Sequence, residues 1–354
     1  MRILLIALSG IGDTLIATPL LRELRANFPS AEIHVLVMWA GARDLLEGNP
    51  CVHRVWQKNM IKNGAFRSLP FIWGLRREHF DVSLNAHTQG RIAYRATAML
   101  IGANLRVSHA YENTRAWERL LIHKTVPEDY SVHSIENNNR LLPLVGGRTL
   151  LADHRMEISL ASGEEKWAAE FIAGNRLGAR KRLGIHVGSG GTKNLALKRW
   201  PLKNYIAFIQ QFSAARPEVS ILLFGGPEEA GAHEQIRAAV PTADVFIPET
   251  RNLRQAAALM KHLDGFLSVD TALMHVAAAM RVRNQIVIEA PTLNKTNVPY
   301  GNPFTLVPNP AVNGRNLEYY RYNGKPIRGT DAELVALMES VTVERVYSAV
   351  TKAI

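Results

Sequence analysis

The chain of 354 residues has little cysteine, fewer acidic than basic residues and no long uninterrupted apolar run. The one cysteine, Cys51, excludes a disulfide framework and a multi-cysteine metal site, which is typical of a reducing compartment. No apolar stretch approaches the length of a membrane span. Arg2 precedes only the apolar run Ile3–Leu8, which is too short for the core of a secretory leader. We therefore expect a cytoplasmic protein.

The shortage of acidic residues leaves a formal net charge of +11 at pH 7. A positive excess of this size predicts an anionic partner, because the summed field of the protein attracts negative charge. Nucleic acid, an anionic membrane surface and a phosphorylated substrate all fit this prediction. No Asp-x-Asp triplet occurs in the sequence, so a metal clamp for a diphosphate has no obvious ligands, and we expect no metal site.

What the sequence does contain is a regular alternation of strand and helix patterns in both halves. Length and a hydrophobic content of 47% favour a globular chain of two domains. Alternation of this kind predicts α/β domains with parallel sheets covered by helices. The pattern lapses over His109–Val132, which we expect to be a long loop. Strands are expected at Ile3–Leu8, Ile33–Val37, His53–Trp56, Val82–Asn85, Leu105–Ser108, Leu183–Val187, Val219–Phe224, Asp244–Ile247, Gly265–Val269 and Gln285–Ile288.

The first strand is followed by a glycine turn that carries an aspartate. A dinucleotide fingerprint would need a third glycine three positions after Gly12, and that position is Leu15. Asp13 lies where a helix cap would lie, and an anion there repels a pyrophosphate. The turn therefore presents a carboxylate, either as a plain helix cap or as a catalytic group.

In the second half, the segment Ser268–Met280 predicts an anion site. A strand ends before Asp270, and a helix begins at Thr271, so the backbone N–H groups of Thr271 and Ala272 are free to bind phosphate oxygens. Asp270 is either a ligand-binding acid at the strand end or an N-cap. His275 is either a ligand-binding residue or a packed helix residue.

Two further stretches carry candidate donors and an acid. The glycine-rich segment His186–Pro201 supplies Ser189, Thr192 and Lys198, whose donors suit phosphate oxygens. Its alternative is a flexible basic loop. Glu228 follows another strand end, where it could accept hydrogen bonds from ribose hydroxyls or simply complement a helix dipole.

Two features of the first half are less specific. His87, Arg91 and Arg95 follow a strand end and are expected to meet an acidic acceptor, unless they form a solvated basic face. The stretch Phe66–Phe80 mixes aromatic residues with arginines. It could lie on an anionic membrane, although burial of the aromatics is the commoner outcome.

These stretches together resemble glycosyltransferase family 9, the bacterial lipopolysaccharide heptosyltransferases. The resemblance rests on "GIGD" at residues 10–13, "KRWP" at 198–201 and "DTALMHVAAA" at 270–279, which occur in the family's order and spacing. It implies a GT-B fold, in which two Rossmann-like domains face each other across a cleft. The implied domains are an acceptor-binding domain at 1–160, a nucleotide-sugar-binding domain at 161–330, and a C-terminal helix at 331–354 that could pack back on the first domain.

The resemblance also implies roles for individual residues. Asp13 is the implied general base of an inverting, metal-independent transfer, with Gly12 beside the acceptor. Lys198, Asp270 and Thr271 would contact the diphosphate and donor sugar, and the acid near Glu228 the ribose. Ala272 stands where the family usually has glycine.

The expected reaction moves a sugar, heptose from ADP-heptose, onto a phosphorylated, lipid-linked core oligosaccharide. It needs no cofactor besides the donor, and it takes place on the anionic inner face of the cytoplasmic membrane. Two alternatives remain at this point. One is a sugar-nucleotide epimerase of related fold, which would not need a long acceptor loop. The other is a basic nucleic-acid-binding protein, although no nucleic-acid module is recognisable and we expect no nucleic-acid partner.

Overall fold

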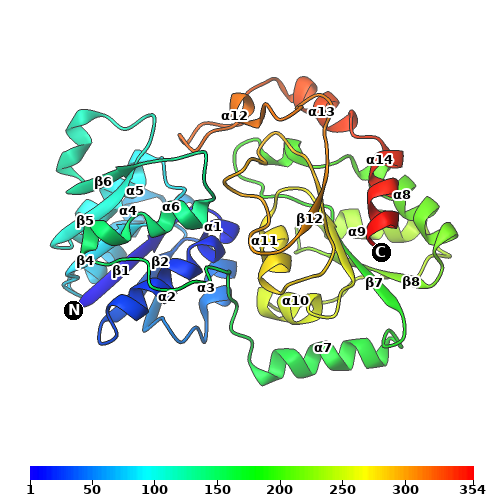
Figure 1. The fold of residues 1–354 in the computed structure, drawn as a ribbon, viewed down its shortest axis with the longest axis horizontal. Coiled ribbons are helices and arrows are strands. Elements are labelled where there is room, and N and C mark those ends of the chain that lie inside the picture. The colour runs from blue at the N-terminus through cyan, green and yellow to red at the C-terminus, as the bar shows by residue number, and fades with distance from the viewer. The chain divides into compact units, whose positions relative to one another are not determined.

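The computed structural model describes residues 1–354 apart from the side chain of Ala65, and the chain divides into two compact units (Figure 1). The first unit comprises Met1–Ser159 and Tyr322–Lys325, and the second comprises Leu160–Arg321 and Pro326–Ile354. The sequence analysis divided the chain at residues 160 and 330. The structure instead returns a short segment, Tyr322–Lys325, to the first unit and keeps the C-terminal residues in the second.

The first unit is built on a parallel sheet in which the described strands follow the order β3-β2-β1-β4-β5-β6. Strand β1 pairs with β2 on one side and with β4 on the other, so the chain order reverses beside β1. In a doubly wound sheet the loops on either side of such a reversal leave a crevice at the carboxyl ends of the strands. The strands are β1 (Arg2–Ala7), β2 (Glu32–Val37), β3 (Arg54–Gln57), β4 (Val82–Asn85), β5 (Leu105–Ala110) and β6 (Lys124–Pro127).

Helices cover both faces of this sheet because β1 is apolar on both of its faces. Ile3, Leu5 and Ala7 share a core with leucines of α2, whereas Leu4 and Ile6 share another core with residues of α4 and α5. Such a continuous apolar run is typical of a central parallel strand. The helices are α1 (Ile11–Ile16), α2 (Thr18–Asn27), α3 (Ala40–Leu46), α4 (Met60–Arg76), α5 (Ile92–Ile101) and α6 (Ser134–Asn139), with 3-10 turns η1 (Ala116–Leu120) and η2 (Leu142–Val145).

The second unit repeats this plan. Its described strands follow the order β12-β11-β10-β7-β8-β9, so the chain order reverses between β7 and β10. The position of this reversal matches that in the first unit, where it falls between β1 and β4. The strands are β7 (Lys181–His186), β8 (Val219–Phe224), β9 (Val245–Phe246), β10 (Gly265–Ser268), β11 (Gln285–Ile288) and β12 (Phe304–Val307).

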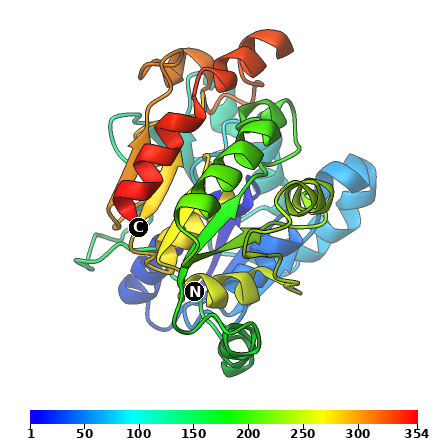
Figure 2. The same ribbon diagram turned by 90° about the vertical axis from the view of Figure 1, so that its right-hand side faces the viewer.

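The helices of the second unit include the two at the C-terminus. Figure 2 shows α14, in red, beside α8, in green. The helices are α7 (Ser162–Gly174), α8 (Leu202–Ala215), α9 (Ala230–Ala239), α10 (Leu253–Met260), α11 (Ala272–Ala279), α12 (Asn316–Tyr319), α13 (Asp331–Glu339) and α14 (Val343–Ala353), and a 3-10 turn η3 spans Leu195–Lys198.

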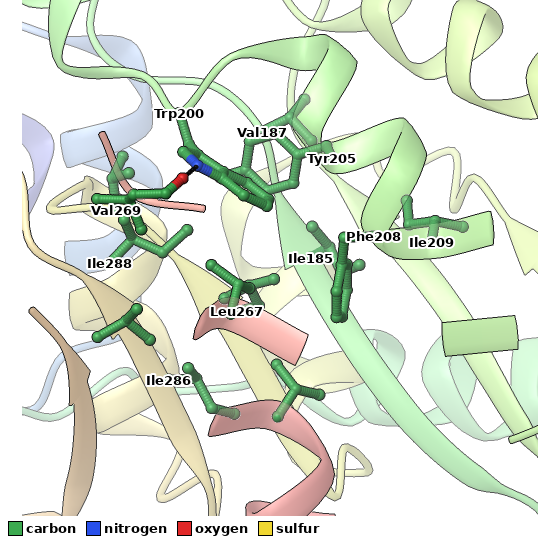
Figure 3. Close-up of a cluster of buried hydrophobic side chains, with 14 of the residues drawn as sticks. Ile185, Val187, Trp200, Tyr205, Phe208, Ile209, Leu267, Val269, Ile286 and Ile288 are labelled. Atoms are coloured by element: carbon green, nitrogen blue, oxygen red, sulfur yellow. Dashed lines mark hydrogen bonds between the residues drawn. The ribbon is translucent and has the colours of Figure 1, made fainter. Parts of the chain in front are cut away.

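Trp200 anchors the start of α8 in the core of the second unit. Its ring lies against Val187 and Tyr205, and its indole Nε1–H donates to the Val341 carbonyl at 2.8 Å (Figure 3). Apolar residues of α14, including Val346, belong to the same core. Within the second unit, α8 and the strands β11 and β12 pack against α14. Packing of the C-terminal helix back on the first domain stays a prediction.

Two short edge strands were missed by the sequence analysis. The stretch His109–Val132, expected to be a long loop, contains η1 and the strand β6. Strand β12 was not expected either. Both are four residues long and mostly solvent-accessible. Edge strands like these bury too little to impose the alternation of apolar and polar residues that identifies a strand.

Within the described part of the chain, no helix combines the length and apolar character that crossing a membrane requires.

Candidate active site

Asp13 lies at the carboxyl end of β1, in the first turn of α1. The N-cap of α1 is Gly10, and Asp13 is the third helical residue, so the expectation that Asp13 itself is the cap is wrong by three residues. The Asp13 carboxylate reaches back and accepts a hydrogen bond from the Gly10 N–H at 2.7 Å. A Cβ at Gly10 would lie 2.9 Å from that carboxylate, which explains the glycine. Gly12, between them, is buried and offers only its backbone.

The second carboxylate oxygen of Asp13 contacts the loop after β4. The Thr88 hydroxyl donates to it at 3.2 Å, across a sequence separation of 75 residues. Thr88 in turn is held by the Ser9 hydroxyl, which donates to its carbonyl at 2.5 Å. Asp13 is half-buried. The chain reversal between β1 and β4 thus places a fixed, solvent-accessible carboxylate at the crevice of the first sheet.

His87, expected to contact an acceptor, is buried inside the first unit. One ring nitrogen lies 3.0 Å from the Ser134 hydroxyl and the other 2.9 Å from the Glu128 carboxylate. Burial, with a smaller contribution from Arg140, lowers the pKa of His87 to about 3. A neutral ring that donates to Glu128 and accepts from Ser134 satisfies every partner. His87 therefore serves the packing of this unit, and the interpretation as an acceptor ligand does not fit its burial.

Arg91 and Arg95 differ sharply in exposure. Arg95 is 1% exposed and forms an ion pair with the buried Glu118. Burial and this ion pair fit neither the expectation that Arg95 meets an acidic acceptor nor the alternative of a solvated basic face. Arg91 precedes α5, is half-buried, and packs close to Gly324 of the returning segment. Of the two arginines, only Arg91 is accessible.

In the second unit, the chain reversal between β7 and β10 brings Lys198 and Asp270 together. The Lys198 ammonium lies 3.2 Å from the Asp270 carboxylate, and both side chains are 9% exposed. The Thr292 hydroxyl donates to the same carboxylate oxygen at 2.7 Å. Burial opposes ionisation of Asp270, but Lys198, His275 and Thr292 outweigh it and lower the pKa of its carboxyl. The site therefore holds a fixed lysine–aspartate pair.

Thr271 begins helix α11 directly after this pair. Its hydroxyl accepts from the Met274 N–H at 3.3 Å, which makes it the N-cap, and lies 3.1 Å from His186 Nδ1. Ala272 is the first helical residue. Burial is the main cause that lowers the pKa of His275 to about 4, while nearby Asp270 acts in the opposite direction. This helix start, with a neutral His275 inside it, offers backbone N–H groups and a positive dipole to an anion.

The glycine-rich loop is ordered by contacts at both of its ends. Ser189, expected to bind the donor, donates its hydroxyl to the Leu195 carbonyl at 2.9 Å and accepts from Arg199 at 3.1 Å. Asn194 is bonded through both side-chain atoms to the Ile327 backbone at 2.9 Å each. Thr192 lies between these anchors and is half-buried. Thr192 is thus the accessible hydroxyl of the two.

The acid that organises this loop is Glu229 and not its neighbour. Glu229 is 7% exposed, accepts from the Gly226 N–H at 2.9 Å, and fills the space where a side chain at Gly188 would lie. Glu228 is exposed and free to face a ligand beside Gly191. Sequence reasoning missed Glu229, Thr88 and Thr292. Glu229 could have been predicted from the glycine pair Gly225-Gly226 that precedes it. Thr88 and Thr292 belong to no motif, so nothing in the sequence indicated their role.

Among the described residues, one group has metal-ligand spacing: Glu32, His34 and His53, whose ligand atoms lie within 4.8 Å of one another. It lies at the amino ends of β2 and β3, at the opposite strand ends from Asp13. Trp56 donates to His34 Nδ1 at 3.1 Å, so the proton of the neutral ring stays on Nε2. That nitrogen therefore has no lone pair for a metal.

The two parallel sheets, each with a reversal of chain order and polar side chains at the carboxyl ends of its strands, have the α/β fold of the GT-B type. The chain belongs to glycosyltransferase family 9 (heptosyltransferase), whose family model matches residues 69–323, and it is a glycosyltransferase. It is 22% identical to lipopolysaccharide heptosyltransferase 3 of Escherichia coli K12 over 76% of this chain and 77% of the relative.

Solved structures share the fold over almost the whole chain. A family 9 glycosyltransferase from Veillonella parvula has a TM-score of 0.75 at 20% identity, covering 99% of this chain and 96% of the other. The Escherichia coli heptosyltransferase WaaC with ADP-2-deoxy-2-fluoro heptose has a TM-score of 0.69 at 18% identity, covering all of both chains. The family and the fold inferred from the sequence are confirmed.

The buried histidines predict a stability that falls in mild acid. Burial lowers the pKa of His87 and His186 to about 3 and that of His275 to about 4. The unfolded chain binds these protons below pH ~6.5 but the folded chain does not, so the free energy of unfolding decreases as the pH falls from ~6.5 towards 4. We expect a loss on the order of 1 kcal/mol per pH unit for each histidine. Urea unfolding at pH 7.5, 6 and 5 measures it.

The matched control for this prediction is His275→Gln. Its free energy of unfolding should fall less steeply with decreasing pH than that of the unsubstituted protein. Equal stability of the unsubstituted protein at pH 7.5 and pH 5 would contradict the expected neutral state of these rings.

Proposed function

We propose that the protein is an inverting, metal-independent heptosyltransferase that moves heptose from ADP-heptose onto a phosphorylated, lipid-linked acceptor of the lipopolysaccharide core. The observation that carries the proposal is the Asp13 carboxylate, held by the Gly10 N–H and the Thr88 hydroxyl at the crevice of the first sheet. The names of the related proteins support the sugar and the pathway.

In the proposed reaction, Asp13 removes the proton of an acceptor hydroxyl as its oxygen attacks the anomeric carbon of the donor sugar. The bond from that carbon to the diphosphate breaks, and the nucleoside diphosphate leaves with the bonding electrons. A positioned carboxylate is suited to the first step because the hydroxyl becomes acidic only as the new bond forms. Attack from the side opposite the leaving group inverts the anomeric centre.

Lys198 and the start of α11 would stabilise the charge that develops on the leaving diphosphate. The ammonium, fixed by Asp270, supplies a positive charge that needs no rearrangement during the reaction. Of the residues expected to bind the donor near the glycine-rich loop, Thr192 and Glu228 are accessible, and we assign them to the phosphate and the ribose. Neither role involves a metal ion or another cofactor.

On the acceptor side, the proposal keeps Arg91 and drops His87 and Arg95, which are buried. The protein would act on the inner face of the cytoplasmic membrane, where its basic surface meets anionic lipid, and it would have no nucleic-acid partner.

The family match does not favour the alternative of a sugar-nucleotide epimerase. The sequence argument against an epimerase was that His109–Val132 forms a long acceptor loop. That argument is weaker, because the segment contains the 3-10 turn η1 and the strand β6.

Thermal unfolding with nucleotide sugars, with and without EDTA, tests this proposal. We expect ADP-heptose to raise the melting temperature more than GDP- or UDP-sugars do, since a ligand at a hundred times its Kd stabilises the fold by about 3 kcal/mol. Turnover on a phosphorylated core acceptor should persist in excess EDTA. A larger shift with a GDP- or UDP-sugar would reject the donor, and activity lost in EDTA and restored by magnesium would reject metal independence.

A further inference from the structure

Helix α4 of the first unit carries an exposed apolar stripe. The side chain of Phe66 is 88% exposed, that of Trp73 59% and that of Leu69 44%. Together with exposed Pro70 they recur at helical positions i, i+3, i+4 and i+7, which lie on one face. We call Phe66, Leu69, Pro70 and Trp73 the outer stripe.

The outer stripe is distinct from the face by which α4 packs on its unit. Ile72 and Leu75 are buried in the core that also holds Leu4 and Ile6 of β1, and Ser68 is buried beside them. At 100° per residue, these three positions fall on the opposite side of the helix from the outer stripe. The helix is therefore anchored by one apolar face and presents a second one to solvent. A surface helix of a globular protein ordinarily presents a polar face there.

The charged residues of the segment that carries the outer stripe are all basic. No Asp or Glu occurs from Gly48 to Arg77, so the whole of α4 lies in an acid-free segment. The basic residues of this segment are Arg54, Lys58, Lys62, Arg67, Arg76 and Arg77. Arg67 and Arg77 are exposed, and the Arg76 guanidinium lies 5.9 Å from the centre of the Trp73 ring.

We propose that α4 is a membrane-docking helix, whose outer stripe enters the interface of an anionic bilayer while the flanking cations bind lipid phosphates. Apolar insertion and attraction to anionic lipid add to each other in such helices. A second copy of this chain fits less well, because a symmetric contact through this face would bring its own cations together. The inference deepens the proposed function, on which it rests for the lipid-linked acceptor.

Site-specific fluorescence tests whether the outer stripe enters lipid. In a Cys51→Ser background, a polarity-sensitive fluorophore is attached at Phe66→Cys, and at Leu150→Cys as a control, since Leu150 is 46% exposed outside α4. Vesicles of phosphatidylcholine with phosphatidylglycerol should shift the emission of the label at residue 66 to the blue and leave residue 150 unchanged. Vesicles of phosphatidylcholine alone should have a much weaker effect.

Vesicle sedimentation separates the apolar and charged contributions. Phe66→Ser with Trp73→Ser should weaken binding to the anionic vesicles about a hundredfold, roughly tenfold for each side chain, whereas Leu150→Ser should not. Arg67→Gln with Arg77→Gln should weaken binding at low salt and reduce its salt dependence. Wild-type protein that does not bind the vesicles, or binding unchanged by the serine pair, would overturn the proposal. A wild-type dimer that becomes a monomer when Phe66 and Trp73 are replaced by serine would also overturn the proposal, because the outer stripe would then be a contact between two copies of the chain.

These outcomes are distinguishable from failure of the proposed function, because the vesicles contain no donor or acceptor. The serine pair should retain normal turnover on a delipidated acceptor. Stripe-dependent vesicle binding without any heptosyl transfer would reject the function alone, and normal transfer with stripe-independent binding would reject the membrane helix alone.

Discussion

Asp13→Asn is expected to lower turnover by ~10²–10⁴-fold, the usual contribution of a positioned general base. The amide cannot take up the acceptor proton. It still accepts one of the two hydrogen bonds that the carboxylate receives from Gly10 and Thr88, so the loss of stability should stay within about 1–2 kcal/mol. ADP-heptose affinity should barely change, since the role proposed for Asp13 is to deprotonate the acceptor. Turnover, donor binding and melting temperature are measured on one preparation.

Thr88→Val is the matched control for this experiment. It removes the hydroxyl that donates to Asp13 and leaves the carboxylate in place. If Asp13 is the base, Thr88→Val costs far less activity than Asp13→Asn, because only the positioning of the base is affected. Similar, small losses in both variants would reduce Asp13 to a structural member of the capping turn.

Lys198→Ala should have the largest combined effect on stability and donor binding. The substitution leaves the buried Asp270 carboxylate without its ion-pair partner, which destabilises a protein by about 3–5 kcal/mol. It also removes the cation assigned to the diphosphate, and loss of a charged hydrogen bond weakens binding by roughly ten- to a hundredfold. Urea unfolding and calorimetric titration with ADP-heptose measure the two effects.

The double variant Lys198→Met with Asp270→Asn separates these two effects. A neutral pair of similar size removes the unpaired charge, so most of the lost stability should return, while donor affinity should remain low. Lys203→Met, which removes a 71% exposed lysine from the same unit, should change neither quantity. Wild-type donor affinity in either Lys198 variant would reject the assignment of Lys198 to the donor site.

The order of elements along each half could be predicted from the sequence, because central parallel strands are buried on both faces and appear as apolar runs. Strand β1, buried from Ile3 to Ala7, is the clearest case. The edge strands β6 and β12 escaped prediction because their side chains are largely exposed. The burial of His87 and Arg95 could not be predicted either. The local sequence around a polar residue is the same whether its side chain faces solvent or pairs with an acid far away in the chain, as His87 does with Glu128 and Arg95 with Glu118.

By itself, the sequence determined the α/β class, the family and the strand ends that carry Asp13 and Asp270, because local spacing and motif order contain that information. Only the tertiary structure decided which groups surround them. The Asp13–Thr88 and Lys198–Asp270 contacts join residues 75 and 72 positions apart. They form because the chain order reverses beside β1 and again beside β7, which brings the loops of two non-consecutive strands to one crevice. No local pattern records such a reversal, since it arises from how whole strands pair.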